Sequence, residues 1–310
     1  MQRVASIDIG TNTILLLIAE FSGDLIEPLF EQETVVRLGE GLLKSGILSP
    51  EAMRRGLQTL TDYSERCRLM GVQTVFAAGT SALREAKNSG EFLQLAKERL
   101  NLAIEVISGQ EEAQASFLAV AKDLREADRS ILVIDVGGGS TELIFGKGER
   151  IDQWVSLPLG LVHFTEEFLV SDPVQEQEWE TMAAVIRKHL RQIPHPRPPF
   201  LMVSVGGTGT TLASVEQGLK DFESKKIHHF VLTREAITRQ LLLYRSRTIE
   251  GRKNIQGLPP NRADVILAGG TILFLAMEEL KCPSVSISTH GVRYGFLYKK
   301  LSSLLKNSIS

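Results

Sequence analysis

The chain has 310 residues, a length typical of about two domains. Its composition, 43% hydrophobic and 23% charged, is close to that of an ordinary globular protein, which argues against wholesale disorder. The 35 Lys and Arg residues nearly balance 37 Asp and Glu residues, so the formal charge is −2. Proteins that bind nucleic acid or membrane surfaces are usually basic, and we therefore expect neither partner.

The cysteines and the apolar segments favour an intracellular protein. Cys67 and Cys282 lie far apart and have no histidine at metal-ligand spacing, so they indicate neither a disulfide framework nor a zinc site. The first ten residues have the pattern of a strand and not of a signal peptide. The longest apolar run, 265–277, is too short to cross a bilayer. We expect a soluble, cytoplasmic protein.

The first 125 residues alternate between predicted strands and helices. Apolar runs at 4–9 and 14–19 flank a glycine-containing turn and predict a β-hairpin. Ser49, Pro50 and Glu51 supply the N-cap, the first helical position and an acidic first turn of a long helix. Further strands are expected at 72–78 and 104–107, and further helices around Arg84, at 91–100 and at 110–124.

The second half repeats this alternation, which is typical of an α/β protein. Strands are expected at 131–136, 143–145, 201–205 and 285–288, a Gly/Thr turn at 206–211 and a buried helix at 262–280. The apolar segment 296–305 predicts a helix. We expect the terminal segment 296–310 to pack back on the first domain.

The sequence around Asp8 recurs around Asp135. Ser-Ile-Asp-Ile-Gly at 6–10 matches Val-Ile-Asp-Val-Gly at 133–137, at an offset of 127 residues, and an apolar run follows each turn. Such a repeat indicates duplication of one domain. We place the boundary in the polar stretch before the second copy, which gives domains at 1–125 and 126–310.

The turn after Asp8 has the composition of a phosphate-binding turn. Gly10 permits close approach of the backbone to a ligand, and successive N–H groups in such a turn form an anion-binding concavity. Thr11 and Asn12 add side-chain donors. Asp8 repels anions, and a hard cation such as Mg²⁺ between Asp8 and the phosphate oxygens resolves that conflict. The alternative is a polar hairpin turn in which the aspartate caps the backbone.

The second turn carries a stronger signal of the same kind. Three glycines clear all side chains from the approach to its backbone, and hydroxyl donors follow them. The residues that we assign to phosphate binding here are Gly137, Gly138, Gly139, Ser140 and Thr141, with Asp135 near the metal. A flexible linker is the alternative. The third turn adds Gly207 and Thr208, with a plain strand-to-helix turn as the alternative, and none of the three turns has the Gly-Lys-Ser/Thr of a P-loop.

Three glutamates are candidates for a catalytic base. Glu142 directly follows the second turn, whereas Glu111 and Glu112 open a predicted helix. Acids at a helix N-terminus complement the helix dipole, an effect worth about 0.3–1 kcal/mol. One glutamate is enough for that purpose, so the second is surplus. A glutamate in either place can orient and deprotonate a water for attack on phosphorus.

Arginine is the side chain best suited to bind phosphate oxygens in a bidentate manner. Arg84 and Arg293, and with less support Arg37, lie beside turn or helix-start signals. The alternative for each is a solvated surface charge. The basic cluster at 225–229 fits either a contact with a long polyanion or an exposed loop.

Together these motifs resemble the exopolyphosphatase/guanosine pentaphosphate phosphohydrolase family, which belongs to the superfamily of actin, sugar kinases and chaperone ATPases. The resemblance rests first on Asp-Ile-Gly-Thr-Asn at 8–12, Ser-Gly-Gln-Glu-Glu-Ala at 108–113 and Asp-Val-Gly-Gly-Gly-Ser-Thr-Glu at 135–142. It extends over essentially the whole chain, with further matches at 80–86, 206–210, 262–266 and 291–295.

The resemblance implies two ribonuclease-H-like domains with an interdomain cleft. It also implies hydrolysis of the terminal phosphate of inorganic polyphosphate, or of the 5′-terminal phosphate of guanosine pentaphosphate, with Mg²⁺. Glu112 matches the catalytic base, Glu142 a second carboxylate near the attacking water, and Asp8 and Asp135 the metal-associated acids. The guanosine substrate links such an enzyme to the stringent response, and K⁺ as a further cation and a homodimer are left open.

Two features depart from the family pattern. The motif that usually reads Gly-Leu-Arg-Glu-Gly is Gly-Val-Arg-Tyr-Gly at 291–295, so its acid is lost while Arg293 is kept. Long members carry a further C-terminal helical domain with a His-Asp motif, and we expect a short form without it. That difference predicts a weaker grip on very long polyphosphate.

Two other functions stay open on the sequence alone. A kinase of the same superfamily, which moves the γ-phosphate of ATP to a small acceptor, fits the turns at Gly137 and Gly206 equally well. A regulator that binds guanosine tetraphosphate without hydrolysis fits the loss of the acid at Tyr294, although Glu112 and Glu142 speak against it.

Overall fold

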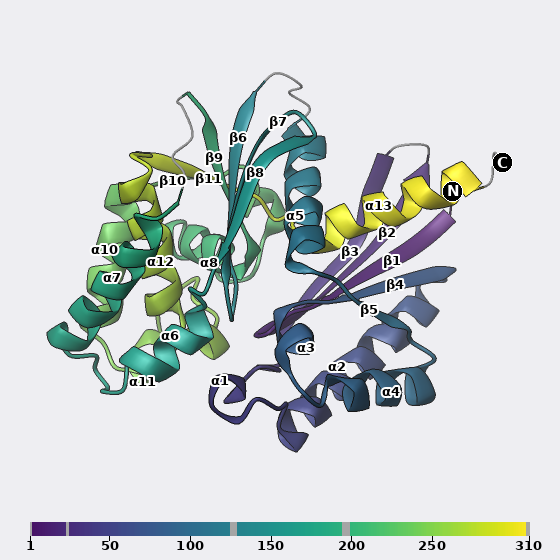
Figure 1. Cartoon of the computed structure of the whole chain (residues 1–310), viewed down its shortest axis with the longest axis horizontal. Coiled ribbons are helices and arrows are strands. Elements are labelled where there is room, and N and C mark those ends of the chain that lie inside the picture. Colours follow the sequence, from purple (N-terminus) through teal and green to yellow (C-terminus); the bar gives the residue numbers. More distant parts are fainter. Residues whose placement is uncertain (1, 23–24, 125–128, 194–198, 308–310) are drawn as a thin grey trace. The chain divides into compact units, whose positions relative to one another are not determined.

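A computed structural model describes residues 2–22, 25–124, 129–193 and 199–307 (Figure 1). The chain forms two compact units. Unit 1 comprises residues 1–119 and 292–310, and unit 2 comprises residues 120–291. The predicted boundary at 125/126 lies outside the described residues, and the division between the units falls earlier, within a helix that spans Gly109–Leu124.

Unit 1 is built on a five-stranded sheet in the order β3-β2-β1-β4-β5. The antiparallel strands β1 (Gln2–Ile9), β2 (Thr13–Ser22) and β3 (Leu25–Val35) form a meander, and β4 (Thr74–Gly79) and β5 (Ile104–Val106) continue the sheet in parallel with β1. The helices of unit 1 are α1 (Leu42–Ser45), α2 (Pro50–Leu69), α3 (Ser81–Glu85), α4 (Ser89–Leu100), α5 (Gly109–Leu124) and α13 (Val292–Asn307).

The central strand β1 is buried from Val4 to Ile9 because both of its faces are covered. Ile7 belongs to a core with α2 and α4, whereas Val4 packs with Tyr294 and Leu297 of α13 on the opposite face. This alternation follows from the two-residue period of a strand. The prediction that the terminal segment packs on the first domain matches the placement of α13 in unit 1.

Helix α2 begins as its sequence predicts. The Ser49 hydroxyl accepts a hydrogen bond from the Ala52 N–H at 3.1 Å, and Pro50 occupies the first helical position. Its buried face includes Met53, Leu57, Leu60 and Cys67. Gly71 follows the helix with a left-handed φ of 68°, which only glycine adopts without strain.

Unit 2 repeats the sheet of unit 1 with one added strand, in the order β10-β11-β9-β6-β7-β8. Strands β6 (Ser130–Val136), β7 (Thr141–Lys147) and β8 (Arg150–Leu157) form the meander, and β9 (Leu201–Val205) and β11 (Ser284–Ile287) run parallel to β6. The added strand β10 (Val231–Thr233) pairs antiparallel with β11. The predicted α/β class and the duplication are confirmed by this shared strand order.

The helices of unit 2 cover its sheet with a core that includes Leu132, Ile134 and Leu273. They are α6 (Leu161–Phe168), α7 (Glu176–Leu190), α8 (Gly206–Glu216), α9 (Ser224–Ile227), α10 (Arg234–Arg245), α11 (Ile249–Arg252), a 3₁₀ turn (Pro260–Arg262) and α12 (Ile266–Glu279). Two predictions are corrected here. The segment 206–211 is the start of helix α8 and not a free turn, and the buried helix expected at 262–280 begins only at Ile266.

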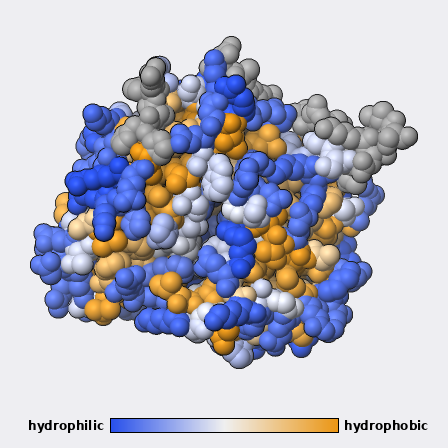
Figure 2. Space-filling model, viewed as in Figure 1, coloured by the Kyte–Doolittle hydropathy of each residue, from blue (hydrophilic) through white to orange (hydrophobic). Residues whose placement is uncertain are grey.

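Figure 2 shows hydrophilic residues spread widely over the visible face of the molecule, with hydrophobic residues between them. Among the residues that the structure describes, no helix combines the length and the apolar character that crossing a bilayer requires.

Candidate functional site

The turn between β1 and β2 contains buried polar groups that the protein leaves unsatisfied. Asp8, at the end of β1, is 8% exposed, and its Oδ1 has no hydrogen-bond partner among the described residues. The same holds for both amide atoms of Asn12, which is also buried. The turn itself is closed by the Gly10 N–H, which donates to the Thr13 carbonyl at 3.0 Å. Buried polar groups are nearly always paired, so these atoms mark a place for a ligand.

A loop that follows β3 supports this turn from behind. The N–H groups of Val36 and Arg37 donate to the Asn12 carbonyl at 3.0 and 2.9 Å, and the Gly39 N–H donates to the Thr11 carbonyl at 2.8 Å. Residue 37 adopts a left-handed φ of 51°, an uncommon conformation for arginine. The backbone of the first turn is therefore tied to the loop 36–39.

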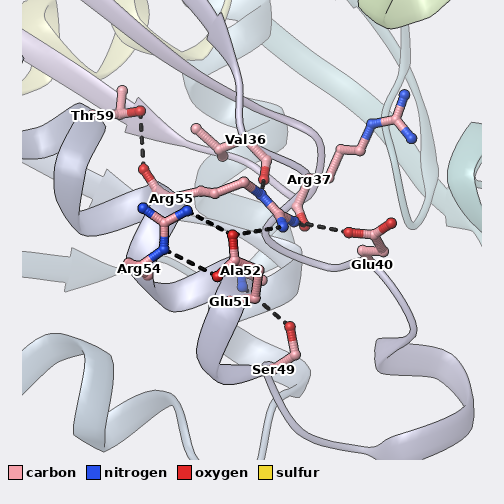
Figure 3. Close-up of polar contacts among 9 residues, drawn as sticks. All are labelled: Val36, Arg37, Glu40, Ser49, Glu51, Ala52, Arg54, Arg55 and Thr59. Carbon is pink, nitrogen blue, oxygen red and sulfur yellow. Dashed lines mark hydrogen bonds and ion pairs between the residues drawn. The ribbon is translucent and has the colours of Figure 1, made fainter.

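Arg55 of helix α2 in turn fixes that loop (Figure 3). Its Nε donates to the Val36 carbonyl at 2.8 Å, and its Nη2 donates to the Arg37 carbonyl at 3.2 Å and to Glu40 at 2.8 Å. Figure 3 shows the Arg37 side chain extending away from this group of contacts. Arg55 therefore positions the main chain of the loop, and the Arg37 side chain takes no part in these contacts.

Asp8 lies in a setting that disfavours its charge. Burial raises the pKa of Asp8 to about 7, the negative charge of Glu112 adds to the rise, and the positive charge of Arg293 opposes it. A carboxylate held in this way gains most from a bound cation, because a cation restores the charged form.

Glu112, on the first turn of α5, is the buried member of the glutamate pair. Its side chain is 13% exposed, and its Oε2 accepts a hydrogen bond from Arg84 Nη1 at 2.8 Å. Burial raises the pKa of Glu112 above its ordinary value, and the Arg84 guanidinium counteracts the rise. The Arg84 Nη1 also donates to the Ile107 carbonyl at 2.9 Å. Within the described part of the chain, Nε and Nη2 of Arg84 have no protein partner, which leaves them for an anion.

Glu111 has a structural role instead. Its Oε2 accepts from both the N–H and the hydroxyl of Ser108 at 2.8 Å, while its own N–H donates back to the Ser108 hydroxyl at 3.2 Å. This reciprocal pair is a capping box at the start of α5. These hydrogen bonds hold the pKa of Glu111 below its usual value. The prediction of Glu111 as a catalytic candidate is corrected, because its carboxylate is committed to the helix end.

Arg293, a predicted phosphate ligand, is paired with a carboxylate that the sequence did not reveal. Its Nη2 donates to Glu31 Oε1 of β3 at 2.6 Å, and the hydroxyl of Tyr294 donates to the same oxygen at 3.0 Å. The side chain of Arg293 is only 7% exposed. Tyr294 stands where the family motif has an acid, and Glu31 supplies a negative charge to Arg293 instead. The Arg293 guanidinium is therefore paired with a carboxylate inside unit 1.

In unit 2 the equivalent hairpin carries two carboxylates. Asp135 pairs with Glu142 across β6 and β7, and Glu142 pairs with Ser156 across β7 and β8, so the three side chains lie in one row on one face of the sheet. Glu142 is 3% exposed, and its Oε1 accepts from the hydroxyls of Ser140 and Ser156, each at 2.7 Å. Like charges directly opposite each other destabilise a sheet, which makes this row a candidate cation or water site.

The Gly137–Gly139 turn of unit 2 packs closely against the start of α6. The carbonyls of Gly137 and Gly138 accept from the Leu161 and Val162 N–H groups at 3.0 Å, at the start of α6. A Cβ on Gly160 would lie 2.3 Å from the Gly138 carbonyl oxygen, so this segment presses directly on the turn. The glycines therefore serve close packing as well as any approach of a ligand, and the linker alternative is wrong because the turn is held between two strands.

Two predicted phosphate ligands are turned inward. The hydroxyl of Thr141 donates to the Leu159 carbonyl at 2.5 Å, and that of Thr208 donates to the Val136 carbonyl at 3.2 Å. Both residues are buried, with exposures of 0 and 1%. Their hydroxyls are taken up by unit 2, so we correct both assignments as far as the side chains are concerned.

The start of helix α8 brings Asp135 and an unpredicted arginine close to the backbone. A Cβ on Gly206 would lie 2.6 Å from Asp135 Oδ1, and one on Gly207 would lie 2.0 Å from Arg262 Nη2. Gly206 also has a left-handed φ of 78°. Both glycines are thus needed for the side chains that lie against them. Arg262 is buried and was missed as a candidate, although it opens the Arg-Ala-Asp motif at 262–264.

Oxygen ligands are available for a hard cation in each unit. Mg²⁺ binds carboxylate, amide and phosphate oxygens. Asp8 and Asn12 contribute buried oxygens without protein partners, and Asp135 lies beside Glu142. The residues predicted to be metal-associated fit that chemistry.

Comparisons with known proteins agree with this arrangement. Residues 17–304 match the Ppx/GppA phosphatase family. The chain is 32% identical to exopolyphosphatase 2 of Mycobacterium tuberculosis, over 95% of this chain and 97% of that protein. It is 31% identical to the guanosine-5′-triphosphate,3′-diphosphate pyrophosphatase of Vibrio parahaemolyticus, over 98% of this chain but 60% of that protein. A crystal structure of the Aquifex aeolicus Ppx/GppA family member superposes with a TM-score of 0.82 at 33% identity, over 97% and 98% of the two chains.

Proposed function

Because the chain belongs to the Ppx/GppA phosphatase family, we propose that it hydrolyses phosphoanhydride bonds, releasing the terminal phosphate of inorganic polyphosphate, the 5′-terminal phosphate of guanosine pentaphosphate, or both. The relative named for polyphosphate is matched over nearly its whole length, whereas the chain spans 60% of the relative named for the guanosine nucleotide. Polyphosphate is therefore the first substrate to test.

The observation that carries the proposal is that the two adjacent glutamates lie in different environments. Glu111 caps α5, and Glu112 is buried beside Arg84 with a raised pKa. A carboxylate whose pKa is raised toward the working pH is a better proton acceptor than an ordinary surface glutamate. In our proposal Glu112 accepts the proton of the attacking water, and Arg84 holds the carboxylate in place while its remaining donors bind phosphate oxygens.

Unit 2 supplies the second group of residues in this proposal. Glu142, fixed by Ser140 and Ser156, is the carboxylate of unit 2 that we propose to accept a hydrogen bond from a water. The N–H groups of the Gly137–Gly139 turn and of the first turn of α8, with Arg262, stabilise negative charge on the phosphoryl oxygens. Gly10, Thr11 and Asn12 of unit 1 bind a further phosphate.

We propose Asp8 and Asp135 as the residues that would hold Mg²⁺, together with phosphate oxygens of the substrate. When bound, Mg²⁺ neutralises charge on the phosphoryl oxygens. The unpartnered Oδ1 of Asp8 supports the assignment. The cytoplasmic location and the link to the stringent response stay predictions, and K⁺ as a further cation and a homodimer stay open.

The alternatives lose support from the family match. The family model and the relatives that we compared are named for phosphatase, exopolyphosphatase and pyrophosphatase activities, and a sugar-type kinase is not among them. A non-hydrolytic regulator would not need a buried glutamate held by an arginine.

The test exploits the adjacent glutamates as a matched pair. Phosphate release from polyphosphate should fall about 10²–10⁴-fold in Glu112→Gln. Glu111→Gln should retain activity within a few-fold, because its loss affects only the helix end. Equal activity of Glu112→Gln and the parent would remove Glu112 from the role of base. The same assay on short polyphosphate, long polyphosphate and guanosine pentaphosphate ranks the substrates.

A further inference from the structure

Three histidines surround one carboxylate in unit 2, among residues that the proposed hydrolysis does not use. Asp123 lies near the end of α5, His228 and His229 follow α9, and His290 follows β11. The chain has only six histidines, so half of them gather at this one aspartate.

The nitrogen atoms point at the carboxylate. Asp123 Oδ1 lies 3.1 Å from His228 Nε2 and 3.7 Å from His290 Nδ1, and Asp123 Oδ2 lies 3.5 Å from His229 Nε2. The ligand atoms of Asp123, His228 and His290 all lie within 4.8 Å of one another. The side chain of Asp123 is 12% exposed, so the cluster is sheltered but reachable from solvent.

The imidazole rings are packed against one another. The ring centroids of His228 and His229 are 3.9 Å apart, and those of His228 and His290 are 4.4 Å apart and stacked. Neutral imidazole is the form that binds metals.

Asp123 supplies the oxygen ligand of the cluster. Its Oδ1 lies 3.1 Å from His228 Nε2, a hydrogen bond that fixes the carboxylate against the rings.

The backbone is shaped to bring the second histidine into the cluster. His229 adopts a left-handed φ of 64°, which is uncommon for a residue with a side chain. Its N–H donates to the Ile287 carbonyl at 2.7 Å, which anchors this conformation to β11.

We propose that Asp123, His228 and His290 bind one divalent cation of the borderline class, such as Zn²⁺, Co²⁺ or Ni²⁺, with His229 or water as the fourth ligand. Two imidazole nitrogens and one carboxylate oxygen suit these ions. Mg²⁺ prefers a shell of oxygens, so this site differs in chemistry from the phosphate-binding residues. The inference does not depend on the proposed hydrolysis.

Small side-chain adjustments suffice for binding. Ligand atoms around tetrahedral Zn²⁺ are about 3.3–3.4 Å apart, as follows from metal–ligand lengths near 2.0–2.1 Å. The separations of 3.1 and 3.7 Å from Asp123 Oδ1 bracket this value. The Thr289 N–H donates to His228 Nδ1 at 3.2 Å, so Nε2 carries the ring proton that Asp123 accepts. Metal binding at Nε2 moves this proton to Nδ1, and the ring must then turn from the Thr289 N–H toward the Thr289 Oγ1, which lies 3.4 Å from Nδ1 and can accept the proton.

Such an ion would join segments at both crossings of the chain between the units. One crossing is at 119/120, four residues before Asp123, and the other is at 291/292, directly after Gly291 and next to His290. A bound ion links α5 to the segment after β11 and to the α9–β10 loop. We therefore expect the bound ion to stabilise unit 2 near the two points where the chain passes between the units.

The experiment uses the full chain, stripped with a chelator and then held in excess Mg²⁺ to occupy oxygen-rich sites. Co²⁺ is added with visible absorption as the readout, and Zn²⁺ affinity is measured by competition with a chromophoric chelator. We expect one equivalent to bind, with the visible bands of low-coordinate Co²⁺, and the midpoint of thermal unfolding to rise with Zn²⁺.

Four variants separate this site from others. His290→Ala should weaken Zn²⁺ binding at least tenfold, and His290→Gln serves as a second variant if the alanine form is unstable. His189→Ala, in α7, is the matched histidine control and should bind as the parent does. Asp8→Asn should also bind normally. Stoichiometric binding that survives His290→Ala and His290→Gln, loss of binding in Asp8→Asn, or a parent that binds no equivalent of either ion would overturn the proposal.

Discussion

The two hairpins that begin the units share a backbone and differ in chemistry. The Gly10 N–H donates to Thr13 at 3.0 Å, and the Gly137 N–H donates to Ser140 at 2.9 Å, at the same register offset. In unit 1, however, Leu15 lies opposite Asp8, whereas in unit 2 Glu142 lies opposite Asp135. The duplication has preserved the turn and replaced one cross-strand neighbour.

The neighbour decides how each carboxylate is held. Asp8 faces an apolar residue, has no hydrogen-bond partner for Oδ1 among the described residues, and is influenced by the charges of Glu112 in α5 and Arg293 in α13. Glu142 is fixed by two serine hydroxyls from its own sheet. One hairpin thus keeps a buried acid with an unpartnered oxygen among the described residues, and the other fixes Glu142 with hydroxyl groups of its own sheet.

The two turns are also supported differently from behind. The carbonyls of Thr11 and Asn12 accept from the loop 36–39, whereas those of Gly137 and Gly138 accept from the first turn of α6. In both cases the protein uses up turn carbonyls. This arrangement suits a turn whose N–H groups are to meet an anion.

The largest expected effect concerns the two aspartates. Because the pKa of Asp8 is raised to about 7 in the folded protein, its contribution to stability is greatest below its ordinary pKa and is lost as the pH rises through 7. With Mg²⁺ present, Asp8→Asn should abolish phosphate release, because the substituted side chain no longer supplies a carboxylate to the cation. In chelator, the same substitution should raise the free energy of unfolding at pH 8 by up to about 4 kcal/mol, with little gain at pH 4. Urea unfolding at both pH values measures this.

Asp135→Asn is the comparison for that experiment. We expect it to abolish activity without a comparable stability gain, since Asp135 is only partly buried. Equal pH dependence of the two variants would contradict the difference between the hairpins.

The next effect concerns the segments that support the two turns from behind, namely the loop 36–39 in unit 1 and the segment at Gly160 in unit 2. Gly160→Ala would place its Cβ 2.3–2.4 Å from backbone atoms of Gly138 and Gly139, which cannot move aside. Gly39→Ala would place its Cβ 2.3 Å from the Thr11 methyl group, which can rotate. We expect losses of about 3 kcal/mol for the first and about 1 kcal/mol for the second, as for overpacked cores. Thermal unfolding of both variants decides the order, and a reversed order would show that the loop of unit 1 is the more rigid support.

The smallest effect concerns the loop 36–39. Arg55→Lys keeps the charge but cannot reproduce the bonds to the carbonyls of both Val36 and Arg37. We expect a loss of about 1 kcal/mol in stability and a several-fold rise in KM for polyphosphate with kcat nearly unchanged. Steady-state kinetics test this, with Arg54→Lys as the control because Arg54 pairs only with Glu51 on the helix surface. A fall in kcat alone would place Arg55 in the chemical step instead.

Local signals account for what the sequence predicted well. The hairpins, the N-cap of α2 and the parallel strands are specified by residues close to one another in the chain. Strands β3 and β8 were missed because they are partly exposed edge strands, and β3 includes Pro28 and three glutamates. Such strands lack the alternation that identifies a half-buried strand.

The candidate site was predicted as a set of residues but not as a set of roles. The spacing of Ser108 and Glu111 fits a capping box and could have removed Glu111 from the catalytic candidates. No local pattern pairs Arg293 with Glu31, which lies 262 residues earlier. The direction of the Thr141 and Thr208 hydroxyls depends on tertiary neighbours, so the sequence could not reveal it.

The return of the chain to unit 1 through α13 has a consequence for synthesis on the ribosome. Val4, Leu17 and Ala19 of the first two strands pack with Tyr294, Leu297 and Leu301 of the last helix. All of unit 2 is therefore translated before α13 can pack on β1 and β2. Unit 1 can be completed only after unit 2 has been made, so the usual order, in which the N-terminal domain matures first, does not hold for these two units.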